Sequence, residues 1–386
     1  MGESFMLKLY GQLTALNEGM LSRRLLSVTD DSALPPSDAS TMALLTDEDK
    51  VPSGYGAVFR RQESAKAAQS TPTYLLPPSL AHVASGDIVR LDGDRNSIRI
   101  LFRKESNHNA ILLTERCNHY CLMCSQPPKE VDDSWLLSEA HELIKLMPPD
   151  VFELMYTGGE PTLYGDVFIG LLQHTKDVLP NTIIHILSNG RAFKDIAYAR
   201  KYAAIRHPDM MLGIPLYSDD PVRHDYVVQA KGAFSETIAG ILNLKSLHQQ
   251  VEIRIVLHKQ TIGRLVQLAE FIARNLLFVD HVALMGLEIT GFTRANLDEL
   301  WIDPYDYKDS LSEAVRVLEV AGLRVSVYNH QLCLVNRDVE HVCLKSISDW
   351  KAEYMDECRT CSKRSCCGGL FSSSKEHKFS AHIHAF

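Results

Sequence analysis

Six short apolar runs alternate with longer amphipathic segments between residues 110 and 288, and this alternation most restricts how the chain can fold. In the longer segments, apolar residues recur at intervals of three and four, as in helices that bury one face. The apolar runs occupy residues 110–114, 152–157, 182–187, 211–216, 251–256 and 281–288. Six strand–helix units in succession predict a parallel sheet with right-handed crossovers. Because six units are too few to close an eight-unit barrel, we expect a partial barrel or an open doubly wound sheet.

Polar motifs follow the first four predicted strands. A group of three cysteines follows the first strand, Thr-Gly-Gly-Glu-Pro the second, Ser-Asn-Gly the third and Tyr-Ser the fourth. In parallel α/β folds the ligand site lies at the carboxyl ends of the strands. We therefore expect these four motifs to contribute to one site.

The three cysteines after the first strand are Cys117, Cys121 and Cys124, with the spacing C-x3-C-x2-C. Three thiolates on one short loop can ligate three irons of a [4Fe–4S] cluster. The fourth iron then keeps an open position, where a substrate or cofactor can bind. A structural zinc ion with His119 as its fourth ligand is the alternative, and the spacing alone leaves both open.

The turn after the second strand consists of Gly158, Gly159, Glu160 and Pro161. The two glycines allow a sharp turn and a close approach of the backbone to a ligand. Glu160 offers a carboxylate to a bound ammonium group, which is a strong, charge-assisted contact. This turn ends the strand that comes after the C-x3-C-x2-C loop. In that position it indicates a cofactor site.

Together these motifs resemble the radical S-adenosylmethionine (SAM) superfamily, which carries C-x3-C-x-Φ-C after the first strand of a partial (β/α)6 barrel. Met123 fills the apolar position Φ, and the resemblance covers about residues 107–302. It implies that the three cysteines hold a [4Fe–4S] cluster whose open iron binds the amino and carboxylate groups of SAM. It also implies that the segment around Glu160 binds the SAM ammonium.

Further SAM contacts are implied at the ends of later strands. Ser188 and Asn189 follow the third strand, and Ser218 follows the fourth. Arg254 lies within the apolar fifth strand, where a charged group needs a partner. That partner is either the SAM carboxylate or a nearby acid. Glu288 ends the sixth strand and either faces the cavity or is a surface carboxylate.

Six of the nine cysteines lie in the C-terminal part of the chain. Cys358, Cys361 and Cys367 form the pattern C-x2-C-x5-C, and either Cys333 or Cys343 could add a fourth thiolate. A closed site of four thiolates suits a second [4Fe–4S] cluster or a structural zinc ion.

The pattern C-x2-C-x5-C is similar to the auxiliary-cluster region of peptide-modifying radical SAM enzymes of the SPASM and twitch types. The next cysteine of the SPASM pattern is replaced by Phe371, which indicates a shortened version with one auxiliary cluster. Cys366 stands next to Cys367, so the pattern leaves open which of the two is the ligand.

Four blocks of sequence together resemble the radical SAM maturase of the His-Xaa-Ser system, its C component HxsC. The blocks are residues 112–128, 156–166, 346–358 and 366–371, and the resemblance runs from about residue 86 to residue 386. It implies reductive cleavage of SAM to a 5'-deoxyadenosyl radical, and modification of a ribosomally made peptide by hydrogen abstraction. The implied partners are a peptide with His-Xaa-Ser repeats, a second radical SAM maturase, and an electron donor such as flavodoxin or ferredoxin.

Three other functions stay open. A radical SAM enzyme acting on a small molecule would share the same motifs. A two-cluster electron-transfer protein would explain the cysteines but not the Gly-Gly-Glu turn. A zinc-stabilised binding module would explain only the C-terminal cysteines.

The predicted fold is thus an α/β partial (β/α)6 barrel, similar to a TIM barrel, over residues 106–305. Residues 1–105 are expected to form a β-containing accessory region, and residues 306–386 a Cys-rich auxiliary-cluster extension. Turn formers between residues 34 and 79 predict loops with little packed core. Residues 86–103 alternate apolar and polar residues about an Asp-Gly-Asp turn, which predicts a β-hairpin. This hairpin either offers an edge strand to a peptide or packs as a cap over the barrel.

The net charge of -8 gives no basic footprint for nucleic acid or for an anionic membrane. The first 20 residues lack the pattern of a signal peptide, and no apolar run reaches the roughly 18 residues of a membrane span. We therefore expect a cytoplasmic protein, where cysteines serve as metal ligands rather than in disulfides. The histidines of residues 376–386 are expected to lie on a solvated tail.

Overall fold

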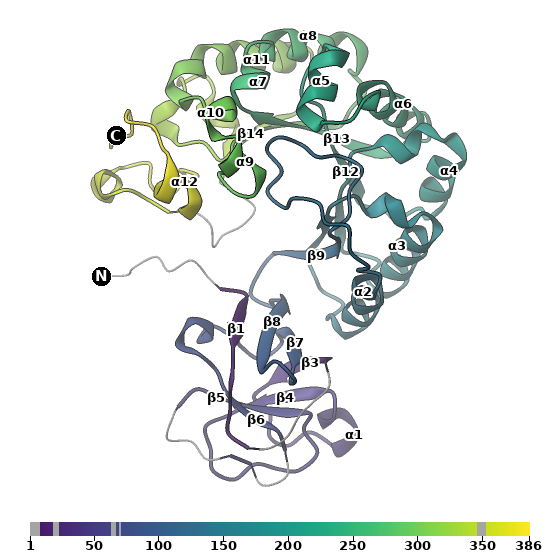
Figure 1. The fold of residues 1–386 in the computed structure, drawn as a ribbon, viewed down its shortest axis with the longest axis vertical. Helices are drawn as coiled ribbons and strands as arrows, with labels where there is room; N and C mark the ends of the chain where they lie inside the picture. The colour runs from purple at the N-terminus through teal and green to yellow at the C-terminus, as the bar shows by residue number, and fades with distance from the viewer. Residues whose placement is uncertain (1–7, 18–22, 63–66, 69–70, 346–352) are drawn as a thin grey trace.

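Two eight-stranded sheets organise the chain (Figure 1). The computed structural model describes residues 8–17, 23–62, 67–68, 71–345 and 353–386. Residues 346–352, which belong to one of the four sequence blocks above, lie outside the described residues. The first sheet is built from strands before residue 103 and the second from strands after residue 107.

The first sheet closes on itself. Its strands are β1 (Tyr10–Gln12), β2 (Thr14–Ala15), β3 (Arg24–Thr29), β4 (Met42–Leu45), β5 (Ala57–Arg60), β6 (Thr73–Leu75), β7 (Ile88–Asp92) and β8 (Ser97–Phe102), in the spatial order β1-β8-β7-β3-β4-β5-β6-β2. β1 pairs with β8 and β2 pairs with β6, both antiparallel. Because only Leu13 separates β1 from β2, this one segment joins the two edges of the sheet.

The expectation of loops with little packed core between residues 34 and 79 is wrong. β4, β5 and β6 lie in this region, and every residue of β5 is buried. Phe59, Tyr74 and Leu80 belong to a separate hydrophobic core inside this sheet. The strands escape sequence analysis because they have only three or four residues each, too few to show a period between the Pro- and Gly-containing turns.

The predicted hairpin is confirmed by the antiparallel pairing of β7 with β8. Each of its strands has a second neighbour, since β7 also pairs with β3 and β8 with β1. The hairpin therefore offers no free edge to a peptide. Instead, this sheet packs beside helix α2 (Trp135–Leu146), where the Arg90 Nη1 lies 2.8 Å from Glu139 Oε1 and the Arg23 guanidinium lies 3.5 Å from the centre of the Trp135 ring.

The second sheet is parallel and contains the six predicted strands in sequence order. They are β9 (His108–Thr114), β10 (Glu153–Gly158), β11 (Ile183–Leu187), β12 (Met210–Pro215), β13 (Gln250–Leu257) and β14 (His281–Gly286). Two further strands, β15 (Val325–Tyr328) and β16 (Cys343–Leu344), continue the sheet beyond β14. The α/β partial-barrel fold is therefore confirmed.

Helices cover the outer side of this curved sheet, as the arc of coiled ribbons in Figure 1 shows. The helices that pack on its outer side are α2, α3 (Asp166–Val178), α4 (Ile196–Ala204), α6 (Ala233–Ser246), α8 (Leu265–Asn275) and α11 (Lys308–Val320). The short helices α5 (Pro221–Val228), α7 (Lys259–Ile262), α9 (Phe292–Ala295) and α10 (Leu297–Leu300) lie near the carboxyl ends of the strands. Two further helices lie outside the barrel region of the sequence: α1 (Pro36–Ala39) precedes β4 of the first sheet, and α12 (Ser372–His377) follows β16. In the described parts of the chain, no helix combines the length and apolar character that crossing a membrane requires.

Strand alternation separates the core from the inside of the barrel. On β13, the side chains of Val251, Ile253 and Ile255 belong to the large core between sheet and helices. Successive side chains of a strand point to opposite faces. Glu252 and Arg254 therefore point to the inner face, so that charged groups stand inside the barrel.

We predict that Phe59→Ala destabilises the protein by about 3 to 5 kcal/mol, because it leaves a cavity in the core of the first sheet. Phe152→Ala is the matched control, since Phe152 is 57% exposed whereas Phe59 is 0% exposed. Chemical denaturation followed by circular dichroism measures both. Equal, small effects of the two substitutions would contradict a packed core in this region.

Candidate active site

A cavity of about 440 Å³ runs through the inside of the barrel, from His108 and Glu153 at the amino ends of the strands to the cysteine loop at their carboxyl ends. Its volume falls in the range of about 300 to 1,000 Å³ that is typical of small-molecule sites. The predicted residues that line it are Cys117, Cys121, Cys124, Gly158, Gly159, Glu160, Ser188, Asn189, Arg254 and Glu288.

Two predicted residues lie outside the lining of this cavity. Pro161 is buried and begins the short helix η2 (Pro161–Tyr164). Ser218 is buried as well, and its hydroxyl accepts a hydrogen bond of 3.1 Å from the Asp220 N–H. Both residues shape turns at the carboxyl ends of the strands.

The cysteine loop is anchored by segments far along the chain. The Leu122 N–H donates to the Val227 carbonyl at 2.9 Å, at the end of α5, and the Leu122 carbonyl accepts from Asn296 Nδ2 at 2.9 Å. The Thr293 hydroxyl donates to the Met123 carbonyl at 3.2 Å. These bonds hold the loop against the barrel from two sides. Sequence analysis missed Thr293 and Asn296, which carry no motif of their own.

The three thiols of the loop are half-buried and free of disulfides. Burial raises the pKa of the Cys117 thiol to about 12, and it raises the pKa of Cys121 and Cys124 as well. Without a metal, these groups are therefore protonated at neutral pH. Metal binding to them would release protons, because thiolates are the ligating form.

His119 is buried between the thiols rather than exposed. Its backbone N–H donates to Cys117 Sγ at 3.4 Å, and its Nδ1 lies 4.0 Å from Cys121 Sγ. Burial lowers the pKa of His119 to about 3, so its ring is neutral. Among the described residues, no group of three or more His, Cys, Asp or Glu side chains is spaced to hold a metal ion.

The Gly-Gly-Glu turn packs directly on the cysteine loop. The Gly159 N–H donates to the Thr114 carbonyl and the Glu160 N–H to the Arg116 carbonyl, both at 2.8 Å. A Cβ atom at Gly159 would stand 2.0 Å from the Arg116 carbonyl oxygen, and Gly158 has φ +136°. The glycines are therefore required by the close approach of the loop backbone itself.

Glu160 is fully buried and joins the ends of β10 and β11. Its Oε1 accepts hydrogen bonds from the Thr162 hydroxyl at 2.6 Å and from the Ser188 hydroxyl at 2.8 Å, and its Oε2 accepts from the Asn189 N–H at 2.6 Å. Burial raises the pKa of this carboxyl, while these hydrogen bonds oppose the rise. The arrangement places a carboxylate with a fixed orientation at the cavity wall.

A second set of contacts ties the third strand end to the cysteine loop. The Asn189 Nδ2 donates to Asn118 Oδ1 at 2.6 Å, and the Arg191 Nη1 donates to the Asn118 carbonyl at 3.2 Å. Arg191 is held in turn by Glu236, with Nε and Oε2 2.6 Å apart. Asn118 follows Cys117 in the sequence, and Arg191 follows the Ser-Asn-Gly motif. This adjacency in sequence could have identified both residues, but sequence analysis did not use it.

Arg254 lines the cavity and has an acidic partner. Its Nη1 lies 2.8 Å from Glu252 Oε1, so the salt bridge that was one of two alternatives is present. The guanidinium also faces the cavity.

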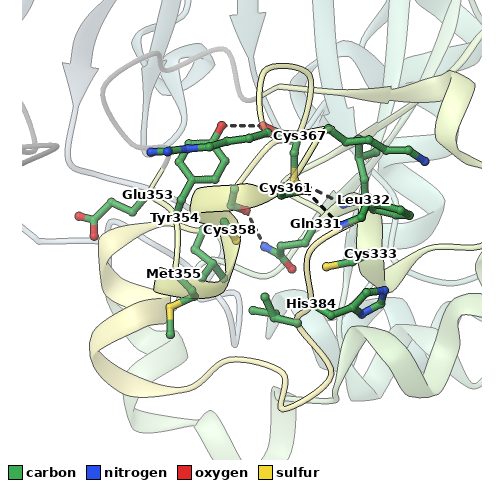
Figure 2. A pocket seen from close by; sticks show the side chains of 16 residues that line it. Gln331, Leu332, Cys333, Glu353, Tyr354, Met355, Cys358, Cys361, Cys367 and His384 are labelled. Carbon is green, nitrogen blue, oxygen red and sulfur yellow. Dashed lines mark hydrogen bonds between the residues drawn. The ribbon is translucent and has the colours of Figure 1, made fainter. Parts of the chain in front are cut away.

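Four cysteines line a second, smaller cavity near the C-terminus, shown in Figure 2. They are Cys333, Cys358, Cys361 and Cys367, whereas Cys343 and Cys366 do not line it. The Leu332 N–H donates to Cys367 Sγ at 3.5 Å. The structure thus brings together three cysteines of the C-terminal loop with one cysteine from the segment after β15.

The prediction that the tail histidines are solvated is confirmed, since His377, His382 and His384 are exposed, and the tail also contacts the second cavity. Ile383, His384 and Phe386 are part of the cavity lining, and the Phe386 N–H donates to Cys361 Sγ at 3.5 Å. The His382 ring stacks on Tyr305, with ring centres 4.0 Å apart. Phe379 and Phe386 stay 40% and 42% exposed, so these contacts leave most of the tail in solvent.

Part of this chain matches a known protein family. Residues 111–272 match the family described as the Radical SAM superfamily, a stretch that runs from β9 into α8. A search of curated proteins finds no match to this chain.

Several solved structures are similar to this chain. Native anSMEcpe with bound AdoMet and the Kp18Cys peptide is similar with a TM-score of 0.50 and 14% identity, over 72% of this chain and 92% of that one. SuiB of Streptococcus suis bound to S-adenosylmethionine is similar with a TM-score of 0.47 and 16% identity, over 68% of this chain and 56% of that one. The chain spans about half the length of the SuiB structures that it matches.

The matched stretch contains the cysteine loop, the Gly-Gly-Glu turn and five of the six predicted strands. At these low identities, the likeness to anSMEcpe concerns the fold. The family match and the fold agree on the same part of the chain, and residues 111–272 are a radical SAM superfamily domain.

Proposed function

We propose that this chain is a radical SAM enzyme that binds a [4Fe–4S] cluster on Cys117, Cys121 and Cys124 and SAM in the barrel cavity. One observation carries the proposal: the three thiols and the buried Glu160 carboxylate face the same cavity at the carboxyl ends of the strands. Three thiols from one loop fit a cluster that keeps one iron open. A two-cluster electron-transfer protein has no use for the Gly-Gly-Glu turn.

An external reductant would supply one electron to the cluster, and SAM would then yield methionine and the 5'-deoxyadenosyl radical that removes a hydrogen atom from the substrate. The residues of the chain would bind SAM and the substrate, orient them, and exclude water from the cavity. The Glu160 carboxylate would accept a hydrogen bond from the SAM ammonium. Ser188 and Asn189 donate hydrogen bonds to the same carboxylate and so lie next to this position. Gly158 and Gly159 shape this turn. Pro161 and Ser218 would contribute through the turns that they form.

Arg254 would bind the SAM carboxylate. Among the described residues that line the barrel cavity, it is the one Lys or Arg. Its planar guanidinium suits a carboxylate, to which it can present two parallel N–H donors. Glu288 also lines the cavity and would contact SAM or substrate.

We propose a second [4Fe–4S] cluster on Cys333, Cys358, Cys361 and Cys367. Four thiols around one cavity suit a closed cluster site, and the sequence resembles a one-cluster version of the auxiliary region. Such a cluster would bind substrate or accept an electron from the product radical. Cys343 and Cys366 lie outside this lining and are the control positions.

The substrate class that we propose is a ribosomally made peptide with His-Xaa-Ser repeats, on the strength of the four sequence blocks. The Kp18Cys peptide named with the anSMEcpe structure belongs to the wider class of peptide ligands. The proposed partners are that peptide, a second radical SAM maturase and a flavodoxin or ferredoxin. Nine cysteines without a disulfide support a cytoplasmic location.

Anaerobic reconstitution with iron and sulfide, followed by dithionite and SAM, tests the enzymatic function. We expect the wild type to release 5'-deoxyadenosine, measured by chromatography, and Cys117→Ser to release none, because it removes a ligand of the open cluster. Cys366→Ser is the matched control and should keep full activity, since Cys366 is exposed and lines neither cavity. A colourless protein that holds zinc and leaves SAM intact would contradict the proposal.

Iron analysis tests the second cluster. The reconstituted wild type should hold about eight irons per chain, and Cys358→Ser about four, because the open cluster does not depend on that ligand. Cys343→Ser should keep about eight. Equal loss of iron in Cys343→Ser and Cys333→Ser would contradict the assignment of Cys333.

Mass spectrometry of a His-Xaa-Ser repeat peptide, co-expressed with and without this protein, tests the substrate. We expect a mass change that needs the wild-type chain and is missing with Cys121→Ser. An unchanged peptide in the presence of active enzyme, with the partner maturase also present, would favour a small-molecule substrate instead.

A further inference from the structure

The inside of the barrel holds a network of buried polar groups around Glu252. The inside of a closed (β/α)8 barrel is filled mainly by branched apolar side chains, whereas this partial barrel places charged groups there. Glu252 Oε1 lies 2.8 Å from Arg254 Nη1 and 3.4 Å from His185 Nε2, and its Oε2 lies 2.6 Å from His281 Nδ1. His281 Nε2 lies 2.9 Å from the Ser326 hydroxyl. Side chains from β11, β13 and β14 therefore meet at one carboxylate, and β15 is joined to it through His281.

This environment keeps Glu252 charged. The side chain is 4% exposed, and burial alone would raise its pKa. The nearby His185 ring, the hydrogen bond with His281 and the charge of Arg254 outweigh burial and lower the pKa of Glu252 well below its usual range. A buried carboxylate with this many partners is a fixed negative charge.

Glu252 in turn fixes Arg254, which faces the cavity. Of the five N–H donors of Arg254, Nη1 donates to Glu252, and Nη2 lies 3.1 Å from the Met285 sulfur, which is a weak acceptor. The guanidinium thus keeps donors for a ligand. The Arg254 backbone pairs with Pro215, the last residue of β12, near the carboxyl end of the barrel, and its side chain extends back to Glu252, which pairs with Gly213.

Gly213 on the neighbouring strand leaves the space that this arrangement needs. A Cβ atom there would stand 2.9 Å from Arg254 Cδ and 2.9 Å from His185 Nε2. Both side chains would have to shift to admit one methyl group. The sequence of β12 is therefore matched to the position of the guanidinium.

We propose that Glu252 is a positioning residue that holds Arg254 as the carboxylate-binding group of the barrel cavity, and that its ligand is the carboxylate of SAM. This inference rests on the proposed function. Arg254 has a long, flexible side chain, and each free rotamer lost on binding weakens affinity. Because Glu252, His185 and His281 hold the guanidinium in place beforehand, SAM meets a preorganised site.

Calorimetry of SAM binding to the cluster-loaded, full-length protein tests this role without relying on turnover. Glu252→Gln should weaken SAM binding roughly tenfold, as expected for a lost charge-assisted contact. Arg254→Met should have at least the same effect. The double variant should bind SAM no more weakly than Arg254→Met alone, because Glu252 acts through Arg254.

A glycine substitution supplies a test in which every charged group is retained. Gly213→Ala should also weaken SAM binding, since its methyl group displaces Arg254 and His185. Gly170→Ala is the matched control, because a Cβ atom at Gly170 meets nothing within 4 Å, and it should leave SAM binding unchanged. Iron content and thermal melting of each variant show that the cluster and the fold are retained.

Decarboxylated SAM tests whether Arg254 binds the carboxylate of SAM. The Glu252→Gln and Arg254→Met variants should bind this analogue as tightly as the wild type does, because the analogue lacks the carboxylate that Arg254 binds. Equal weakening for SAM and for the analogue would overturn the proposal, and so would additive effects in the double variant. Unchanged SAM binding with loss of peptide modification would assign Arg254 to a substrate carboxylate and also overturn it. Failure of the wild type to bind SAM would instead refute the proposed function.

Discussion

The contact between Gly159 and the Arg116 carbonyl is the constraint on which the rest of the site depends. It leaves no room for a side chain at Gly159, and it brings the turn after β10 onto the loop after β9. Glu160 then follows with a carboxylate that is held by Thr162, Ser188 and Asn189. The position of the thiols relative to this carboxylate is therefore set by backbone packing, with few rotatable bonds between them.

Alternation along the strands explains why the barrel can be stable and still hold charges. On β13, Ile253 and Ile255 face the core while Glu252 and Arg254 face the cavity. An isolated buried charge would be costly, but each charge here has hydrogen-bonded partners from neighbouring strands. The network can form only after the sheet has assembled, because His185 and His281 come from strands on either side. Fold and cavity chemistry thus depend on the same strand register.

The sequence predicted those features whose residues follow one another closely in the chain. The six parallel strands, the cysteine loop and the Gly-Gly-Glu turn each lie within a few consecutive residues, and the structure brings the two motifs to one cavity. Thr293 and Asn296 could not be predicted, since they reach the cysteine loop from 170 and 174 residues away. The choice between Cys333 and Cys343 as lining of the second cavity is likewise a matter of tertiary packing.

A third cavity shares lining residues with each of the two cysteine cavities, which themselves have no lining residue in common. This cavity shares Gly286, Leu287, Asn329 and Phe371 with the barrel cavity, and Gln331, Gly369 and Leu370 with the four-cysteine cavity. Phe371 stands where the SPASM pattern has a cysteine. The residue in that position therefore lines the barrel cavity and the third cavity, and an aromatic ring stands where the pattern would place a metal ligand.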